Sequence, residues 1–114
     1  MRKRTVVVGF LGSTLDKGKG PKRWEKWRPS VGVCQQEDFL VDRMHLIYQE
    51  HFRSLAERIR RDLRHISPET EVRLDVLEFV DPWDFEEVFA GLLDYATGFG
   101  FDPESESYYF HITT

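Results

Sequence analysis

The sequence predicts an α/β fold in which helices cover a parallel β-sheet. Runs of apolar residues typical of strands alternate along the chain with runs in which apolar residues recur every three or four positions, as in amphipathic helices. The first run, residues 5–11, is continuously apolar, which is typical of a strand covered on both faces. Strands that alternate with helices form parallel sheets with right-handed connections, so we predict a Rossmann-like sheet with flanking helices.

The first half of the chain contains two predicted strands and two helical segments. Residues 23–36 are predicted to be short and helical or irregular, with a break at Arg28-Pro29, because a residue before proline avoids the α region. Residues 41–48 fit a strand or the start of a helix, and we interpret them as a strand. The next helix ends at Ser67-Pro68, and its apolar face comprises Phe52, Leu55, Ala56, Ile59, Leu63 and Ile66.

The second half repeats the alternation. Residues 72–80 are predicted to form a strand. Asp81 is predicted to cap the following helix, with Pro82 in its first turn and Gly98 at its end. The predicted buried face of this helix comprises Phe85, Val88, Phe89, Leu92, Leu93 and Ala96. A polar turn at residues 102–107 leads to a last buried strand at residues 108–114.

Length and composition limit the class of protein. A chain of 114 residues with 40% hydrophobic residues is predicted to form one domain with a packed core. Cys34 is the only cysteine, which favours a reducing compartment, and no run approaches the roughly 20 apolar residues of a membrane span, so we expect a cytoplasmic, soluble protein. Residues 1–28 are strongly basic whereas the remainder is acidic, so the basic segment is either an anion-binding loop or a solvated surface.

The expected strand order 3-2-1-4 places the ligand site beyond the carboxyl ends of strands one and four. Gly12, Ser13 and Thr14 follow the first strand, where a glycine and two hydroxyl groups suit a bound phosphate. The alternative is an ordinary turn, since neither GxGxxG nor a P-loop is present. At the end of the last strand, His111 and Thr113 share one face and Thr114 opens the next loop; the alternative for His111 is a core histidine.

An unusual aromatic and basic motif lies in the first long loop. Trp24 and Trp27 are three residues apart and are predicted to lie on one side of a helical turn, beside Arg23 and Arg28. Such residues stack on bases and pair with phosphates. The alternative is a hydrophobic clamp that holds the loop to the sheet. We find no nucleophile–base set, no metal-ligand spacing among the histidines and no cofactor motif, so we predict no catalytic or metal site.

Seven segments resemble the amino-terminal part of the RtcR family of bacterial transcriptional activators of RNA repair. They are GFLGSTLD (residues 9–16), RWEKWRP (23–29), CQQE (34–37), DR (42–43), SPETEV (67–72), PWDFEEV (82–88) and HITT (111–114). The resemblance implies the first part of a CARF (CRISPR-associated Rossmann fold) domain, truncated after the fourth strand. It also implies that the family's AAA+ ATPase and helix-turn-helix domains are absent from these 114 residues.

The resemblance further implies a regulatory, non-enzymatic sensor in a sigma54-dependent activator. Its expected ligand is an RNA end with a 2′,3′-cyclic phosphate, a tRNA fragment or an oligonucleotide, and its expected partners are the AAA+ domain and a second copy in a homodimer. The two family motifs fall on Gly12, Ser13 and Thr14, and on His111, Thr113 and Thr114. Two alternatives are a ring nuclease that cleaves cyclic oligoadenylate, and an autoinhibitory interaction module without a ligand.

Overall fold

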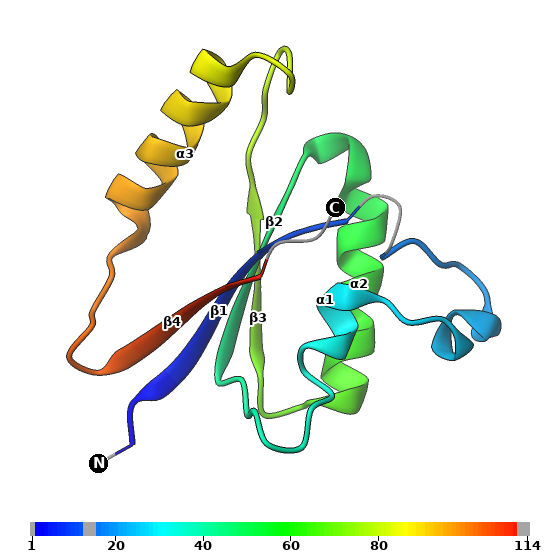
Figure 1. Ribbon diagram of the computed structural model, residues 1–114. Helices are drawn as coiled ribbons and strands as arrows, with labels where there is room; N and C mark the ends of the chain where they lie inside the picture. Colours follow the sequence, from blue (N-terminus) through cyan, green and yellow to red (C-terminus); the bar gives the residue numbers. More distant parts are fainter. Residues whose placement is uncertain (1, 13–15, 112–114) are drawn as a thin grey trace.

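Four parallel strands form one sheet in the order β3-β2-β1-β4 (Figure 1). The computed structural model describes residues 2–12 and 16–111. The strands are β1 (Arg4–Phe10), β2 (Arg43–Tyr48), β3 (Glu71–Val76) and β4 (Glu106–His111). The predicted α/β class, the parallel sheet and its strand order are therefore confirmed. Because β1 is central, Gly9 pairs with Leu46 of β2 on one side and with His111 of β4 on the other.

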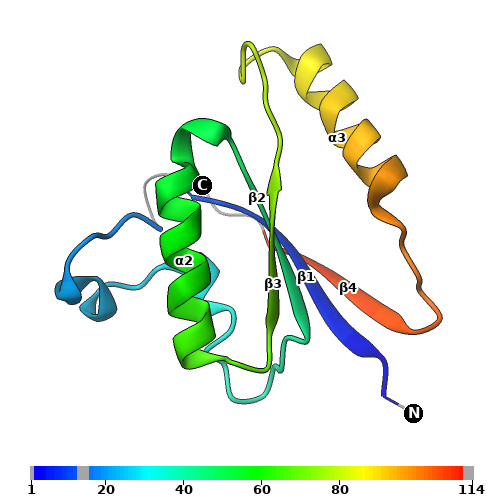
Figure 2. The ribbon, with the colours of Figure 1, turned by 180° about the vertical axis from the view of Figure 1, so that it is seen from behind.

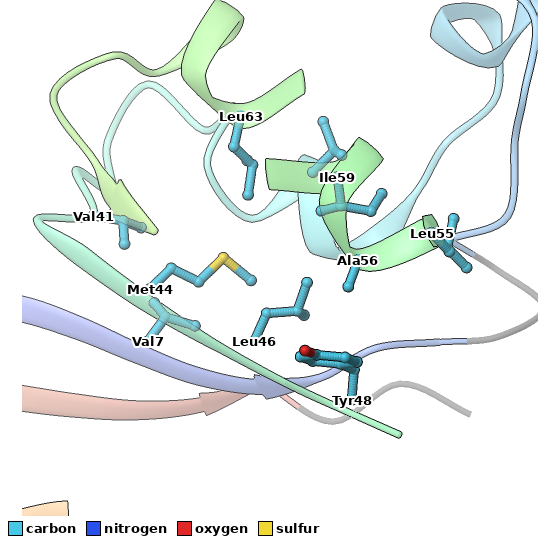
Figure 3. Close-up of a cluster of buried hydrophobic side chains, with 10 residues drawn as sticks. Val7, Val41, Met44, Leu46, Tyr48, Leu55, Ala56, Ile59 and Leu63 are labelled. Carbon is cyan, nitrogen blue, oxygen red and sulfur yellow. The ribbon is translucent and has the colours of Figure 1, made fainter. Parts of the chain in front are cut away.

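The hydrophobic core lies on one face of this sheet, under helix α2 (Arg53–Ile66) and the short helix α1 (Pro29–Gly32). Figure 3 shows Met44 and Leu46 of β2 pointing toward Ala56 and Ile59 of α2. Residues two apart on a strand share a face, which is why alternate residues of β2 enter this core. The predicted amphipathic helix and the strand at residues 41–48 are thus confirmed. The predicted break in helical structure at Arg28-Pro29 is also observed, because the backbone of Arg28 is extended before Pro29.

Helix α3 (Phe85–Phe99) lies on the opposite side of the sheet from α2 (Figures 1 and 2). Its predicted buried face is wrong, because none of its residues is buried and Phe85 is 79% exposed. Only its last turns approach the sheet: the Tyr95 hydroxyl donates to Asp75 Oδ2 at 2.6 Å, and the Phe99 ring lies 4.5 Å from the ring of His45. The first turns stand away from the strands and leave their apolar side chains in solvent.

The ends of α3 also differ from the prediction. Asp84, and not Asp81, is the N-cap, and its carboxylate accepts from the backbone N–H groups of Glu86 and Glu87. Asp81 instead accepts from the N–H of Trp83, and this turn keeps Pro82 outside the helix. Gly98 lies within the helix, which ends at Gly100 in the left-handed conformation, with φ 80°. Both aspartates have a side chain that can cap a helix, so the sequence alone does not distinguish them. In the structure Asp81 forms a turn and Asp84 caps the helix.

Two strands are also placed differently. β3 ends at Val76, so the predicted continuation to residue 80 is wrong. The last hydrogen bond between the two strands runs from the N–H of Leu77 to the carbonyl of Tyr48, the last residue of β2. β4 begins at Glu106, inside the predicted turn, and is not buried as predicted, because it lies at the sheet edge with Phe110 64% exposed. Within the described part of the chain, no helix combines the length and the apolar character needed to cross a bilayer.

Candidate ligand site at the carboxyl edge of the sheet

A cavity of about 290 Å³ lies at the carboxyl ends of β1 and β2. Ligands of parallel α/β sheets bind at this edge, because the loops that follow the strands meet there. Four of the lining residues are aromatic, and the lining comprises Phe10, Leu11, Ile47, Tyr48, Gln49, Phe52, Leu77 and Phe79. No sequence pattern indicated this cavity, since its walls come from three segments whose apolar residues all resemble core positions.

The loop after β1 closes around a buried carboxylate that sequence reasoning missed. Asp16 Oδ2 accepts the N–H of Gly12 at 2.8 Å, and the Asp16 N–H donates to the Gly12 carbonyl at 2.9 Å. Asp16 also accepts the N–H and the hydroxyl of Ser30, at 2.8 and 2.6 Å, in the first turn of α1. The amide of Gly12 is therefore already engaged by an anion of the chain itself. Ser13 and Thr14, the other predicted residues of this loop, lie outside the described residues.

Arg23 and Arg28 both pair with Asp62 of α2. Arg23 donates two hydrogen bonds of 2.9 Å to the two carboxylate oxygens, and Arg28 Nη1 donates to Oδ2 at 2.7 Å. Burial alone would raise the pKa of Asp62, but the hydrogen bonds from the two guanidinium groups outweigh it and hold this pKa below its usual value. Arg28 is only 2% exposed. Both predicted ligand-binding arginines are thus occupied in fastening the first long loop to α2.

The two tryptophans of this loop have different surroundings. The Trp24 ring lies 5.0 Å from the Arg28 guanidinium and 6.0 Å from the His65 ring, so it joins the clamp on α2. Trp27 is 69% exposed, with its Nε1 close to Gly32. The prediction that both share one side of a helical turn is wrong, because the 3-10 helix Pro21–Glu25 ends and the backbone becomes extended at Lys26. Trp27 is the more exposed of the two rings, since Trp24 is 40% exposed.

His111 ends the described part of β4 beside the central strand. A Cβ at Gly9 would lie 3.3 Å from the His111 Cβ, so glycine provides the room that this side chain occupies. His111 Nε2 is buried, and no hydrogen-bond partner for it occurs among the described residues. It borders a cavity of about 260 Å³ between β4 and the segment after α1, lined also by Val7, Val33, Gln36, Phe39, Tyr109 and Phe110. Thr113 and Thr114 lie outside the described residues.

The predicted site residues are only partly brought together. Gly12 is bonded to Asp16 and His111 lies beside Gly9 of β1, whereas Arg23 and Arg28 are paired with Asp62 on α2. Burial raises the pKa of the Cys34 thiol to about 12, so little of it is the nucleophilic thiolate near neutral pH. Across residues 2–12 and 16–111, no three His, Cys, Asp or Glu side chains are grouped closely enough to hold a metal ion.

Comparison of the sequence with known proteins identifies the family of this chain. The sequence profile of the family described as "RtcR: Regulator of RNA terminal phosphate cyclase" matches residues 3–114. The chain is also 50% identical over 113 residues to the "Transcriptional regulatory protein RtcR" of Escherichia coli (strain K12). That alignment covers 98% of the chain and 21% of the E. coli protein, so the chain spans about a fifth of its relative. No solved structure matches it. The chain belongs to the RtcR family, the regulators of RNA terminal phosphate cyclase.

Proposed function

We propose that this chain is the sensor domain of a sigma54-dependent transcriptional activator of RNA repair, and that it binds an RNA end. The ligand is an RNA terminus with a 2′,3′-cyclic phosphate, carried by a tRNA fragment or another oligonucleotide. Binding relieves the repression of an AAA+ ATPase domain in the same protein. The activity of this domain is ligand binding, and ATP hydrolysis belongs to the AAA+ domain. Membership of the RtcR family supports the regulatory role.

The aromatic cavity at the carboxyl ends of β1 and β2 carries this proposal. Phe10, Tyr48, Phe52 and Phe79 surround a volume of about 290 Å³. Aromatic walls suit a nucleobase, because every base offers a flat π-face for stacking, worth about 1–3 kcal/mol per base. The position also fits, since parallel α/β sheets bind nucleotides at this edge.

We assign the phosphate groups of the ligand to the segments at the carboxyl ends of β1 and β4. Gly12, Ser13 and Thr14 come after β1 in the sequence, and His111, the last residue of β4, precedes Thr113 and Thr114. The unpartnered Nε2 of His111 supports this assignment, because a buried imidazole nitrogen without a partner is costly unless a ligand satisfies it. Trp27 supplies an exposed ring for a second base. Arg23 and Arg28 act by positioning the loop through Asp62.

We also propose that the domain forms a homodimer. The exposed apolar side chains of α3 and β4, among them Phe85, Phe89, Leu93 and Phe110, support an interface on this side of the sheet. Exposed apolar area of this kind marks interaction surfaces in folded proteins. Light scattering after size exclusion is expected to give twice the mass of the chain, and a monomer at micromolar concentration contradicts the dimer.

Fluorescence anisotropy with labelled RNA tests the sensor. The purified protein is titrated against an RNA ending in a 2′,3′-cyclic phosphate and against the same RNA ending in hydroxyl groups. We expect tighter binding of the cyclic phosphate, and a loss of at least about five-fold in Phe79→Ala, from the stacking energy of one base. Trp83→Ala removes an aromatic ring that is 92% exposed and does not line the cavity, and it is the matched control. Equal affinity for both RNA ends, or equal behaviour of the two variants, contradicts the proposal.

A further inference from the structure

A second pocket, of about 230 Å³, lies between the loop after β1 and the start of α2. The loop contributes Lys17 and Lys19, and the helical segment contributes the other walls, which are His51, Phe52, Ser54, Leu55 and Arg58. Neither the fold nor the aromatic cavity explains why basic residues from two distant segments meet here. Three side chains that are cationic at neutral pH therefore share one small pocket.

The pocket carries no compensating negative charge. No carboxylate is among its lining residues, and the acidic residues on the same helical segment are paired elsewhere: Glu50 with Arg53, Glu57 with Arg60, and Asp62 with Arg23 and Arg28. Like charges around one pocket repel each other, and a bound anion offsets that repulsion. The first turn of the 14-residue helix α2 adds a favourable dipole and the Ser54 hydroxyl.

The loop is held in this position by hydrogen bonds of the folded chain. Arg58 Nη1 donates to the Gly18 carbonyl at 2.8 Å, and Lys26 Nζ donates to the Lys17 carbonyl at 2.7 Å. Both contacts use backbone oxygens of the loop, and they leave the side chains of Lys17 and Lys19 exposed. The arrangement therefore presents two lysines toward solvent beside an arginine that is fixed on α2.

Phe52 connects this pocket to the aromatic cavity, because it lines both. A base in the aromatic cavity and a phosphate in the basic pocket would then both lie beside Phe52. Sites for single-stranded nucleic acid combine these two features, aromatic rings that stack on bases and basic side chains that contact the backbone phosphates. An acidic peptide or a membrane headgroup would make no use of the adjoining aromatic walls.

We propose that Lys17, Lys19 and Arg58, with Ser54 and His51, bind a backbone phosphate of the RNA strand whose base occupies the aromatic cavity. This inference rests on the proposed function and adds to it a phosphate subsite that does not read the RNA end. Its contribution is the same for every RNA end, because an internal phosphate carries no information about the terminus.

The test measures salt dependence as well as affinity. The purified protein and the Lys17→Ala, Lys19→Ala and Lys22→Ala variants are titrated with a labelled RNA of about ten nucleotides. Lys22 is the matched control, since it is an exposed lysine of the same loop that does not line the pocket. We expect Lys17→Ala and Lys19→Ala each to weaken binding about three- to ten-fold and to reduce the slope of log Kd against log salt by about 0.7.

The two RNA ends separate this inference from the proposed function. Equal weakening of the cyclic-phosphate and hydroxyl RNAs by Lys19→Ala supports the subsite, even where the unmodified protein shows no preference for either end and the sensor proposal fails. If Lys17→Ala and Lys19→Ala bind RNA and respond to salt as Lys22→Ala does, the subsite is overturned. It is also overturned if Lys19 governs binding to anionic vesicles or acidic peptides while RNA does not bind. Circular dichroism melting of all variants excludes unfolding as the cause.

Discussion

The guanidinium of Arg28 is buried against the carboxylate of Asp62, with 2.7 Å between Nη1 and Oδ2. Arg23 closes the other side of the same carboxylate at 2.9 Å. Two cations from the first loop thus share one anion on α2, and Trp24 packs over both guanidinium groups. This triad fastens the later part of the basic loop to α2, and the bonds from Arg58 to Gly18 and from Lys26 to Lys17 hold the segment with Lys17 and Lys19.

Removing the shared carboxylate is expected to destabilise the protein strongly. Asp62→Ala leaves the Arg28 guanidinium buried without a partner, so we expect the free energy of unfolding to fall by about 3 kcal/mol. Urea denaturation followed by tryptophan fluorescence measures it. Arg23→Ala is the control: the Arg23 side chain is more exposed than that of Arg28, and Asp62 keeps its buried partner, so a clearly smaller loss is expected. If the two variants lose the same free energy of unfolding, the buried Arg28–Asp62 pair adds no stability of its own, and the prediction is wrong.

Asp16 is expected to be the main stabilising residue of the loop after β1. Asp16→Ala removes the acceptor for Gly12 N–H, Ser30 N–H and the Ser30 hydroxyl, all of which are buried. We expect a loss of about 2 kcal/mol and faster hydrogen exchange at the Ser30 amide. Asp38→Ala, at an exposed position, is the control and should change neither quantity. Unchanged exchange at Ser30 in Asp16→Ala would contradict this role.

Acid is expected to weaken the contact between β2 and β4. Hydrogen bonds from Arg43 and Tyr108 lower the pKa of Glu106 to about 2. A carboxyl group whose pKa is lower in the folded state stabilises the fold above its unfolded pKa of about 4.3, and this contribution disappears as the pH falls toward 2. We expect Glu106→Gln to be less stable than the unmodified protein at pH 6 by about 1–2 kcal/mol. The difference should vanish near pH 2 in urea titrations, and a constant difference across this range would contradict the assignment.

Two glycines near the end of α3 are expected to respond to alanine in opposite directions. Gly100 has a φ of 80°, where a Cβ is strained, so Gly100→Ala should cost about 1 kcal/mol. Gly98 lies inside the helix with no atom within 4 Å of an added Cβ, so Gly98→Ala should stabilise by about 0.5–1 kcal/mol. Thermal melting of both variants measures the two effects. If Gly100→Ala stabilises the protein, residue 100 does not adopt the left-handed conformation, and the prediction is wrong.

The sequence predicted the elements of this fold better than their surroundings. The apolar run of β1 and the three-to-four spacing of α2 describe local geometry, and both elements lie within a residue or two of their predicted bounds. For α3 the same spacing predicted a buried face that the structure leaves in solvent. An amphipathic pattern shows which side of a helix is apolar, and it does not show whether another element covers that side.

For the candidate site, the sequence singled out the edge and missed most of its geometry. Gly12 and His111 were predicted because they end strands one and four, and the register places His111 beside Gly9 of the central strand. Arg28 has the chemistry of a phosphate ligand, yet its pairing with Asp62 depends on a contact 34 residues away along the chain. The cavity around Tyr48 and Phe52 depends in the same way on three segments that only folding brings together.

The sequence by itself determined the α/β class, the parallel strand order and the RtcR family, because these follow from local periodicity, chain connectivity and sequence similarity. Only the tertiary structure decided which charged groups are free. Arg23 and Arg28 are both paired with Asp62, and the Gly12 amide is engaged by Asp16, whereas no acidic residue lines the basic pocket around Lys17, Lys19 and Arg58. Charge and hydrogen-bonding capacity belong to individual residues, but whether they are satisfied depends on long-range packing, which no local pattern encodes.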